Sequence, residues 1–148
     1  LAYLAGVNKT VFDKKLFGVF PLKSLAPGHP LMGTQDDEFI CPQSRFAGLP
    51  DLEMEEAQKE GKLNLLAYGK DVGYTIFETK DQKQLMHLGH PEYTVHRIIS
   101  EINRDKEKGD VPPPENFDIN SSNTSWRSHR NLLFQQWLWF CYQQVSLS

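Results

Sequence analysis

The sequence predicts an α/β fold, and two patterns carry this prediction. Three short stretches rich in strand-forming residues follow one another between polar turns; they are residues 63–68, 73–78 and 84–88. A helical pattern comes next, with apolar residues at i, i+3, i+4 and i+7: Val95, Ile98, Ile99 and Ile102. We therefore expect an antiparallel meander followed by a helix with one face against the sheet.

Before the meander, the sequence predicts short strands separated by long connections. From the N-terminus we expect the end of a helix at 1–6, a polar connection at 7–15, a strand at 16–20, a loop at 21–33 and a strand at 37–41 that Pro42 stops. Residues 52–62 are acidic and compatible with a helix, although their apolar pattern is poor. A chain that opens inside a helix is most simply part of a longer protein.

The segment after the meander predicts two helices around a long loop. The first spans about 94–107 and ends near Gly109, and the loop spans 110–124. A loop of this length is often functional or lies on a partner subunit. The last helix spans about 128–144, with Ser128 as its N-cap. We expect Trp126, just before it, in the core.

Composition narrows the class of protein. The 148 residues suffice for one domain, and the formal net charge of -3 argues against nucleic acid or an anionic membrane as the main partner. The longest apolar run, residues 137–142, is too short to span a bilayer. The two cysteines, Cys41 and Cys141, show neither metal-ligand spacing nor a disulfide framework, which favours a cytoplasmic protein without a metal.

The stretch Gly89-His90-Pro91-Glu92-Tyr93 carries the strongest chemical signal. Alternate side chains of an extended segment face the same way, so Glu92 can accept a proton from one ring nitrogen of His90 and leave the other as a base. A solvated loop histidine would look the same in sequence. The place of His90 at a strand-to-helix junction brings the catalytic interpretation level with that alternative.

A nucleophile for this base is missing from the sequence. A catalytic cysteine needs access and nearby backbone N–H groups, but Cys41 precedes a proline, and Cys141 lies among aromatic residues. We interpret both cysteines as buried small hydrophobic residues. Ser44, beside Arg45, is better suited to a polar substrate contact than to nucleophilic attack.

Glu101 and Arg104 form a charged pair on the predicted helix after His90. They share a helix face with Arg97, opposite the isoleucines, and a solvated charged face is the simpler interpretation. The functional alternative is that the carboxylate and the guanidinium hold the ammonium and carboxylate of an amino acid.

Together these pieces resemble the homoserine O-acyltransferase (homoserine transsuccinylase) family over nearly the whole chain. The motifs that carry the resemblance are Leu16-x-Gly18-Val19, Asp36-Asp37-x-Phe39, Pro42-x-Ser44-Arg45-Phe46, Gly89-His90-Pro91-Glu92-Tyr93, Glu101-x-x-Arg104-Asp105 and Trp126-Arg127-Ser128-His129-x-Asn131-Leu132-Leu133-Phe134-x-x-Trp137-Leu138. Agreement of all six in order is very improbable by chance.

The resemblance implies a fold and a set of roles. The family has a three-layer, class I glutamine amidotransferase-like (flavodoxin-like) sheet, of which residues 1–148 would be the C-terminal half, with the meander and two helices. The nucleophilic cysteine would lie before Leu1. By resemblance, His90 is the general base and Glu92 its orienting partner. Lys15 and Ser44 match substrate-contacting positions, Arg104 matches the position that binds the amino-acid carboxylate, and Glu101 lies beside it for the ammonium.

The implied reaction is ping-pong transfer of an acetyl or succinyl group from acyl-CoA, through a cysteine thioester, to the homoserine hydroxyl in methionine biosynthesis. The resemblance implies a homodimer and no bound cofactor.

Two positions depart from the family: Gln43 stands where histidine is usual and Arg130 where glycine is usual. Gln43 adjoins the substrate region, so serine is an alternative acceptor. The sequence is also compatible with a non-catalytic subunit or a glutamine amidotransferase-type hydrolase; the Glu101–Arg104 pair and the Trp126 motif favour the acyltransferase over the hydrolase.

Overall fold

A computed structural model describes residues 5–107, 109, 111–121 and 123–146. Within these ranges a five-stranded antiparallel sheet has the order β2-β1-β3-β4-β5. Its strands are β1 (Thr10–Ser24), β2 (Glu38–Gly48), β3 (Leu63–Gly69), β4 (Gly73–Thr79) and β5 (Leu85–His87). The helices are α1 (Asp51–Lys59), α2 (Val95–Lys106) and α3 (Arg127–Ser146).

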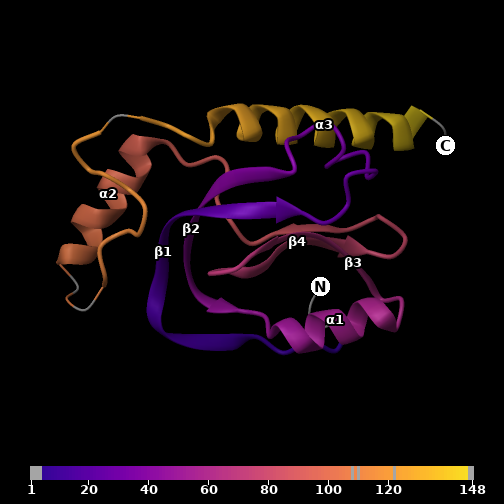
Figure 1. The fold of residues 1–148 in the computed structure, drawn as a ribbon, viewed down its shortest axis with the longest axis horizontal. Helices are drawn as coiled ribbons and strands as arrows, with labels where there is room; N and C mark the ends of the chain where they lie inside the picture. Colours follow the sequence, from indigo (N-terminus) through magenta and orange to yellow (C-terminus); the bar gives the residue numbers. More distant parts are fainter. Residues whose placement is uncertain (1–4, 108, 110, 122, 147–148) are drawn as a thin grey trace.

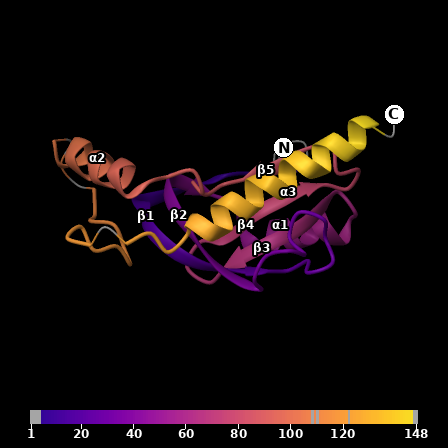
Figure 2. The ribbon, with the colours of Figure 1, turned by 90° about the horizontal axis from the view of Figure 1, so that it is seen from above.

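The sheet lies between two helices, which gives three layers (Figure 1). In that view α3 runs along the top of the sheet and α1 along the bottom, while α2 stands at one end. Seen from above, α3 crosses over the strands of the meander (Figure 2). This α/β arrangement confirms the predicted fold class. The acidic segment whose helical pattern was poor forms α1, so three helices stand where two were expected.

Side chains alternate across the sheet and fill a core on each face. Leu66 of β3 packs in the cluster that includes Leu133 of α3, whereas its neighbour Leu65 packs in the cluster that includes Met54 of α1. A third cluster joins Phe17 to Ile98 and other apolar residues at the α2 end. Both faces of the sheet therefore carry apolar side chains, which α3 and α1 shield from water.

The long β1–β2 hairpin is where the sequence expectations were wrong. Strand β1 begins at Thr10, within the expected polar connection, and continues to Ser24, into the expected loop. Strand β2 passes through Pro42, which pairs with Val19, instead of stopping there. A proline lacks the N–H that a central strand needs, but β2 is the outermost strand on its side of the sheet and tolerates it.

The meander and the two later helices follow the prediction closely. Strands β3, β4 and β5 pair in sequence order, and Thr94 caps α2 by accepting a hydrogen bond from the Arg97 N–H at 3.2 Å. Helix α3 begins at Arg127, so Ser128 lies inside the first turn and the predicted N-cap is wrong. The helix is instead anchored by the Trp126 indole N–H, which donates to the Tyr93 carbonyl at 2.7 Å. Trp126 is buried, as expected.

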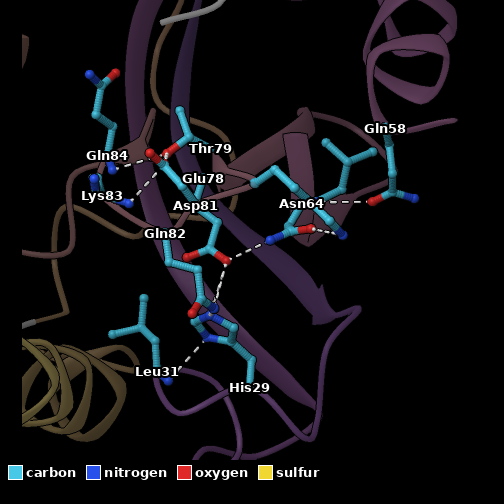
Figure 3. A network of polar contacts seen from close by, with 12 residues as sticks. His29, Leu31, Gln58, Asn64, Glu78, Thr79, Asp81, Gln82, Lys83 and Gln84 are labelled. Carbon is cyan, nitrogen blue, oxygen red and sulfur yellow. Dashed lines mark hydrogen bonds and ion pairs between the residues drawn. The ribbon is translucent and has the colours of Figure 1, made fainter. Parts of the chain in front are cut away.

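The loop between β1 and β2 is held to the meander by a polar network (Figure 3). The His29 Nε2 atom lies 3.2 Å from the Glu78 carboxylate, and His29 Nδ1 accepts a hydrogen bond from the Leu31 N–H at 3.1 Å. Asn64 and Gln82 donate to the same Glu78 oxygen at 2.9 and 3.1 Å. The buried Glu78 is therefore satisfied from three separate segments.

Several expectations concern the ends of the chain and of its helices. The expected helix end at 1–6 falls mostly outside the described residues; Gly6 has a φ of +81°, in the left-handed region. The expected end of α2 near Gly109 is close, since the helix stops at Lys106. No helix among the described ranges combines the length and the apolar character needed to cross a membrane.

Candidate functional site

His90 and Glu92 lie in the turn that follows β5. The His90 Nδ1 atom is 2.8 Å from Glu92 Oε1, which confirms the predicted hydrogen bond. Because an ionised carboxylate can only accept, Nδ1 is the donor in this contact, and Nε2 carries the lone pair when the ring is neutral. The His90 N–H donates to the Pro42 carbonyl at 2.8 Å, and its ring stacks on Tyr93 with centroids 4.3 Å apart. The imidazole is thus held by Glu92 and Tyr93, and the main chain of His90 is held by Pro42.

A cavity of about 350 Å³ opens beside His90. Leu85, Pro91, Leu133, Phe134 and Trp137 line it together with His87, Gly89, His90 and Glu92. The His90 side chain is one-third exposed, so its ring can be reached from this cavity. A larger cavity of about 670 Å³ lies between the β1–β2 hairpin and the β3–β4 turn, away from His90.

A buried charged cluster forms where β1, β2 and α2 meet. Glu101 Oε1 lies 2.7 Å from Arg104 Nη2 and 3.2 Å from Lys15 Nζ, and it accepts a hydrogen bond from Ser44 Oγ at 2.9 Å. Asp105 pairs with Lys15 at 2.6 Å and with Arg104 Nε at 2.9 Å. Lys15, Ser44, Glu101 and Arg104, which the sequence singled out, therefore come together, with Asp105 completing the cluster.

In this cluster the neighbouring cations and hydrogen-bond donors lower the pKa of the carboxylates more than burial raises it. Burial alone would raise the pKa of Glu101, but hydrogen bonds from Ser44, Arg104 and Lys15 outweigh it and lower that pKa. The Arg104 and Lys15 hydrogen bonds likewise lower the pKa of Asp105 to about 2, against the opposing effect of burial. Both carboxylates are therefore ionised at neutral pH. The second oxygen of Glu101, Oε2, is buried and has no hydrogen-bond partner in the described part of the chain.

The simpler interpretation of Glu101, a solvated face opposite the isoleucines, is wrong. Glu101 and Asp105 are 5% exposed and lie on the buried side of α2 with Ile98 and Ile102. Among the charged side chains of the cluster, Arg104 is the one that is exposed, with 46% of its side chain in contact with solvent. Helical spacing alone could not show this, because the buried Lys15 that makes it possible comes from β1, far away in sequence.

The cluster and the base do not share one cavity. None of Lys15, Ser44, Glu101 and Arg104 lines the cavity at His90. Tyr93 lies between the two. Its ring stacks on His90, and burial together with the nearby Glu101 carboxylate raises the pKa of the Tyr93 hydroxyl group. The four polar residues therefore lie together, but the expectation that they converge on the same cleft as His90 is wrong, and Tyr93 lies between the cluster and the His90 ring. Sequence reasoning missed the role of Tyr93, although it stands inside the His90 motif.

Gln43 and Cys41 pack behind the His90 turn. A Cβ on Gly89 would lie 2.6 Å from Gln43 Nε2 and 2.8 Å from Cys41 Sγ, so only glycine allows this approach. Gln43 is fully buried, and its Nε2 has no partner in the described residues, while its Oε1 accepts from Arg45 at 3.2 Å. Gln43 therefore packs against Gly89 behind the turn and is not among the residues that line the cavity.

The two cysteines differ in environment. Cys41 is fully buried, and burial, reinforced by the Glu92 charge, raises the pKa of its thiol, which makes it a poor nucleophile. Cys141 is exposed on α3, so the expectation that it is buried is wrong. Trp137 and Tyr142, two of the aromatic neighbours that suggested burial, are themselves exposed on this helix.

Two further histidines lie near the site and were not singled out as chemical groups. Burial lowers the pKa of His87 to about 3 and that of His129 to about 4, so both are neutral at physiological pH. His129 stacks on Phe39 with centroids 3.9 Å apart. His87 accepts a hydrogen bond from the Gly89 N–H at 3.0 Å through Nδ1.

Similar proteins share both the sequence and the fold. The sequence profile of the homoserine O-succinyltransferase family matches residues 1–147. The Bacillus subtilis (strain 168) homoserine O-acetyltransferase is 35% identical over 98% of this chain and 49% of its own length. The Vibrio vulnificus (strain YJ016) homoserine O-succinyltransferase is 37% identical over 98% of this chain and 48% of its own length.

Solved structures agree on the architecture. A glutamine amidotransferase from Thermotoga maritima superposes with a TM-score of 0.66 at 12% identity, over 92% of this chain and 55% of that one. A glutamine amidotransferase from Methylobacillus flagellatus gives 0.66 at 13%, over 93% and 57%. The fold is therefore glutamine amidotransferase-like, and the chain spans about half the length of the curated relatives it matches. By sequence, it belongs to the homoserine O-succinyltransferase family.

Proposed function

We propose that this chain carries the base and the amino-acid-binding part of a homoserine O-acyltransferase. Such an enzyme moves an acetyl or succinyl group from acyl-CoA to the homoserine hydroxyl in methionine biosynthesis. The observation that carries the proposal is the 2.8 Å contact between His90 Nδ1 and Glu92 Oε1, which leaves Nε2 as a base beside an accessible cavity. Family membership supplies the reaction class.

His90 acts in the second half of the reaction. Its Nε2 takes the proton of the amino-acid hydroxyl as the oxygen attacks the acyl carbon of a cysteine thioester; the C–S bond then breaks and the thiolate leaves. Glu92 keeps the ring in the tautomer that exposes Nε2 and stabilises the imidazolium that forms. The buried Cys41 and the outward-facing Cys141 are not suited to hold the thioester, so the nucleophile belongs to a part of the enzyme outside these residues.

The charged cluster binds the zwitterionic end of the acceptor. Glu101 Oε2 is a buried carboxylate oxygen without a hydrogen-bond partner in the described residues, and an ammonium group would satisfy it. The half-exposed guanidinium of Arg104 is held by Glu101 and Asp105 through Nη2 and Nε, which leaves Nη1 for the substrate carboxylate. Lys15 and Ser44 position Glu101 through its Oε1. Tyr93, whose ring stacks on His90, lies between this cluster and the base.

The complete enzyme is proposed to be a cytoplasmic homodimer. Acyl-CoA is a co-substrate here, and no metal or bound cofactor takes part in the proposed steps. The net charge of -3 agrees with a small-molecule partner.

The test uses a hybrid enzyme in which this chain replaces the matched half of the Bacillus subtilis homoserine O-acetyltransferase. We expect release of CoA from acetyl-CoA or succinyl-CoA with homoserine, and loss of this activity after thiol alkylation. His90→Ala should lower kcat by roughly 10²- to 10⁴-fold, the range for removal of a general base. The exposed His96 of α2, changed to Ala, is the matched control.

Two outcomes would change the proposal. A higher kcat/KM with serine than with homoserine would reassign the acceptor, in line with the Gln43 departure. A folded hybrid whose CoA release is the same with and without His90 would remove this residue from catalysis and leave a non-catalytic subunit as the better description.

A further inference from the structure

We propose that Tyr93 is a positioning residue that sets the distance between His90 and the charged cluster, and that it thereby selects homoserine over the shorter serine as the acceptor. The inference rests on the proposed function, because it concerns the acceptor of that same site. Tyr93 is 7% exposed and belongs to the core cluster that also contains Ile98 and Trp126. A side chain fixed in a close-packed core can act as a rigid spacer between two groups.

Hydrogen bonds hold the main chain of Tyr93 on both sides. Its N–H donates to the His90 carbonyl at 3.0 Å, and its own carbonyl accepts from the Trp126 indole N–H at 2.7 Å. The His90 N–H in turn donates to the Pro42 carbonyl at 2.8 Å. The turn that carries the base is therefore tied both to β2 and to the start of α3. A tyrosine side chain has only two torsion angles, so little freedom remains once this backbone is fixed.

The ring of Tyr93 fixes the placement of the imidazole. The two ring centroids are 4.3 Å apart and the ring planes are inclined by 22°, so the rings stack nearly parallel. At the same time His90 Nδ1 is held 2.8 Å from Glu92 Oε1. These two contacts restrain the ring in its plane and across it. The position of Nε2, the nitrogen proposed as the base, is therefore defined relative to the Tyr93 ring.

The hydroxyl end of Tyr93 lies at the charged cluster. Glu101, Arg97 and Ser44 are all close enough to influence the ionisation of this hydroxyl group, whose pKa is raised by burial first and by the Glu101 charge second. The Arg97 guanidinium also lies over the Tyr93 ring, with its Cζ 5.5 Å from the centroid. Tyr93 thus contacts the base through its ring and approaches the cluster through its hydroxyl group, so one rigid side chain separates the two.

An acceptor held at the cluster has to reach the base past Tyr93. Its ammonium would lie at Glu101 Oε2, the buried oxygen that has no partner among the described residues, and its carboxylate at Arg104. Neither Glu101 nor Arg104 lines the cavity at His90, so the acceptor hydroxyl has to extend away from the cluster. Homoserine carries its hydroxyl one methylene farther from the α-carbon than serine does. One methylene in a packed site is worth roughly 10- to 200-fold in kcat/KM.

The experiment compares kcat/KM for homoserine with kcat/KM for serine in the hybrid enzyme. We expect the parent to prefer homoserine by at least roughly tenfold. Tyr93→Leu removes the ring and should bring the ratio of the two values close to one, whereas Tyr93→Phe keeps the ring and should keep most of the preference. Tyr68→Leu is the matched control, because Tyr68 of β3 also packs on an aromatic ring, that of Tyr74 in β4, with centroids 5.0 Å apart. A purely structural loss would lower kcat with both acceptors and leave their ratio unchanged.

Each outcome supports or overturns the inference. A Tyr93→Leu enzyme with the ratio of the parent would overturn it and leave Tyr93 as a residue that only stabilises the turn. A parent that does not prefer homoserine would overturn it as well. If Tyr93→Leu does not fold, Tyr93→Met takes its place under the same criterion. If the hybrid releases no CoA, the proposed function fails, and calorimetric titration of the hybrid with L-homoserine and with L-serine decides the inference: tighter binding of homoserine that Tyr93→Leu abolishes supports it, and equal binding overturns it.

Discussion

At the scale of single residues, the site depends on pairs that face each other across long sequence separations. Helical spacing predicted that Glu101 and Arg104 are neighbours, but it could not predict that Lys15 enters from β1 and draws both Glu101 and Asp105 inward. The result is an arginine held rigidly by two carboxylates and still open to solvent. A guanidinium held in this way is preorganised for a carboxylate ligand.

Replacing this guanidinium should weaken acceptor binding. In the hybrid enzyme, Arg104→Ala removes a charge-assisted partner worth about 1.5–3 kcal/mol, so KM for the amino acid should rise roughly 10- to 150-fold. Steady-state kinetics at varied homoserine measure this. Lys106→Ala, also exposed in the last turn of α2, is the control. An unchanged KM would remove Arg104 from the amino-acid site.

Acid should loosen the same cluster. Folding lowers the pKa of Asp105 to about 2 from its ordinary value of 3.8, chiefly through the Arg104 hydrogen bond. An acid with a lowered pKa stabilises the folded state at neutral pH, and this stabilisation is lost as pH falls through its ordinary pKa toward the lowered one. Urea unfolding between pH 5 and about pH 2 should therefore show a steeper loss of stability in the parent than in Asp105→Asn. Parallel curves would contradict this.

Gly89 illustrates a constraint that the sequence shows only as a motif. A methyl group there would collide with Gln43 Nε2 and Cys41 Sγ, so Gly89→Ala should shift the His90 turn and lower both kcat and Tm in the hybrid enzyme. Gly28→Ala is the control, since a Cβ at Gly28 meets nothing within 4 Å. Adding Gln43→Ala removes one of the colliding atoms and should restore part of the loss. If Gly89→Ala behaves like Gly28→Ala, the close packing is not required.

At the scale of secondary-structure elements, the hydrophobic periodicity of the sequence predicted the meander and α2 correctly but underestimated the length of the β1–β2 hairpin. The meander and α2 were predicted because each has a regular pattern over a short span. Strand β1 was underestimated because its first half, from Thr10 to Lys15, is mostly exposed and has no alternating pattern. It pairs with β2 at Thr10 and Val11, and the register is irregular from there to Leu16, which a single-strand pattern cannot reveal. Cys141 was assigned to the core because its neighbours are aromatic, but the direction of the helix places Cys141 outward together with Trp137.

The connection between α3 and the base turn can be tested directly. The Trp126 indole donates to the Tyr93 carbonyl at 2.7 Å in a site where Trp126 is 1% exposed. Trp126→Phe keeps most of the ring but leaves that carbonyl unsatisfied, which should cost about 1–3 kcal/mol in the free energy of unfolding. Urea unfolding measures the loss, and Trp139→Phe on the exposed side of α3 is the control. Equal stabilities for the two variants would show that the hydrogen bond contributes nothing.

At the scale of the whole molecule, family membership and fold class followed from motifs that span almost the full chain, whereas the roles of the site residues stay predictions. Residue patterns could not separate the sides of α3, because apolar side chains occur both at the buried Leu133 and at exposed positions such as Leu138 and Trp139.

We therefore expect the 148-residue chain alone to be inactive and marginally stable. Without a nucleophile, the residual rate should be lower than that of the hybrid enzyme by several orders of magnitude. CoA release and light scattering during slow heating measure activity and aggregation. Steady acyl-CoA turnover by the purified chain with homoserine or serine would show that the nucleophile lies within it, and Ser44 and Cys41 would be the first residues to change.

The way in which β2 holds the base has a consequence for how such enzymes diversify. The Pro42 carbonyl fixes the His90 main chain, whereas the side chains that follow it, Gln43 and Ser44, reach toward the turn and the acceptor cluster. Main-chain anchoring is insensitive to side-chain identity. Substitutions along this strand can therefore change the side chains beside the charged cluster while the main chain of His90 stays in register, so the surroundings of the imidazole can vary without loss of its main-chain anchor.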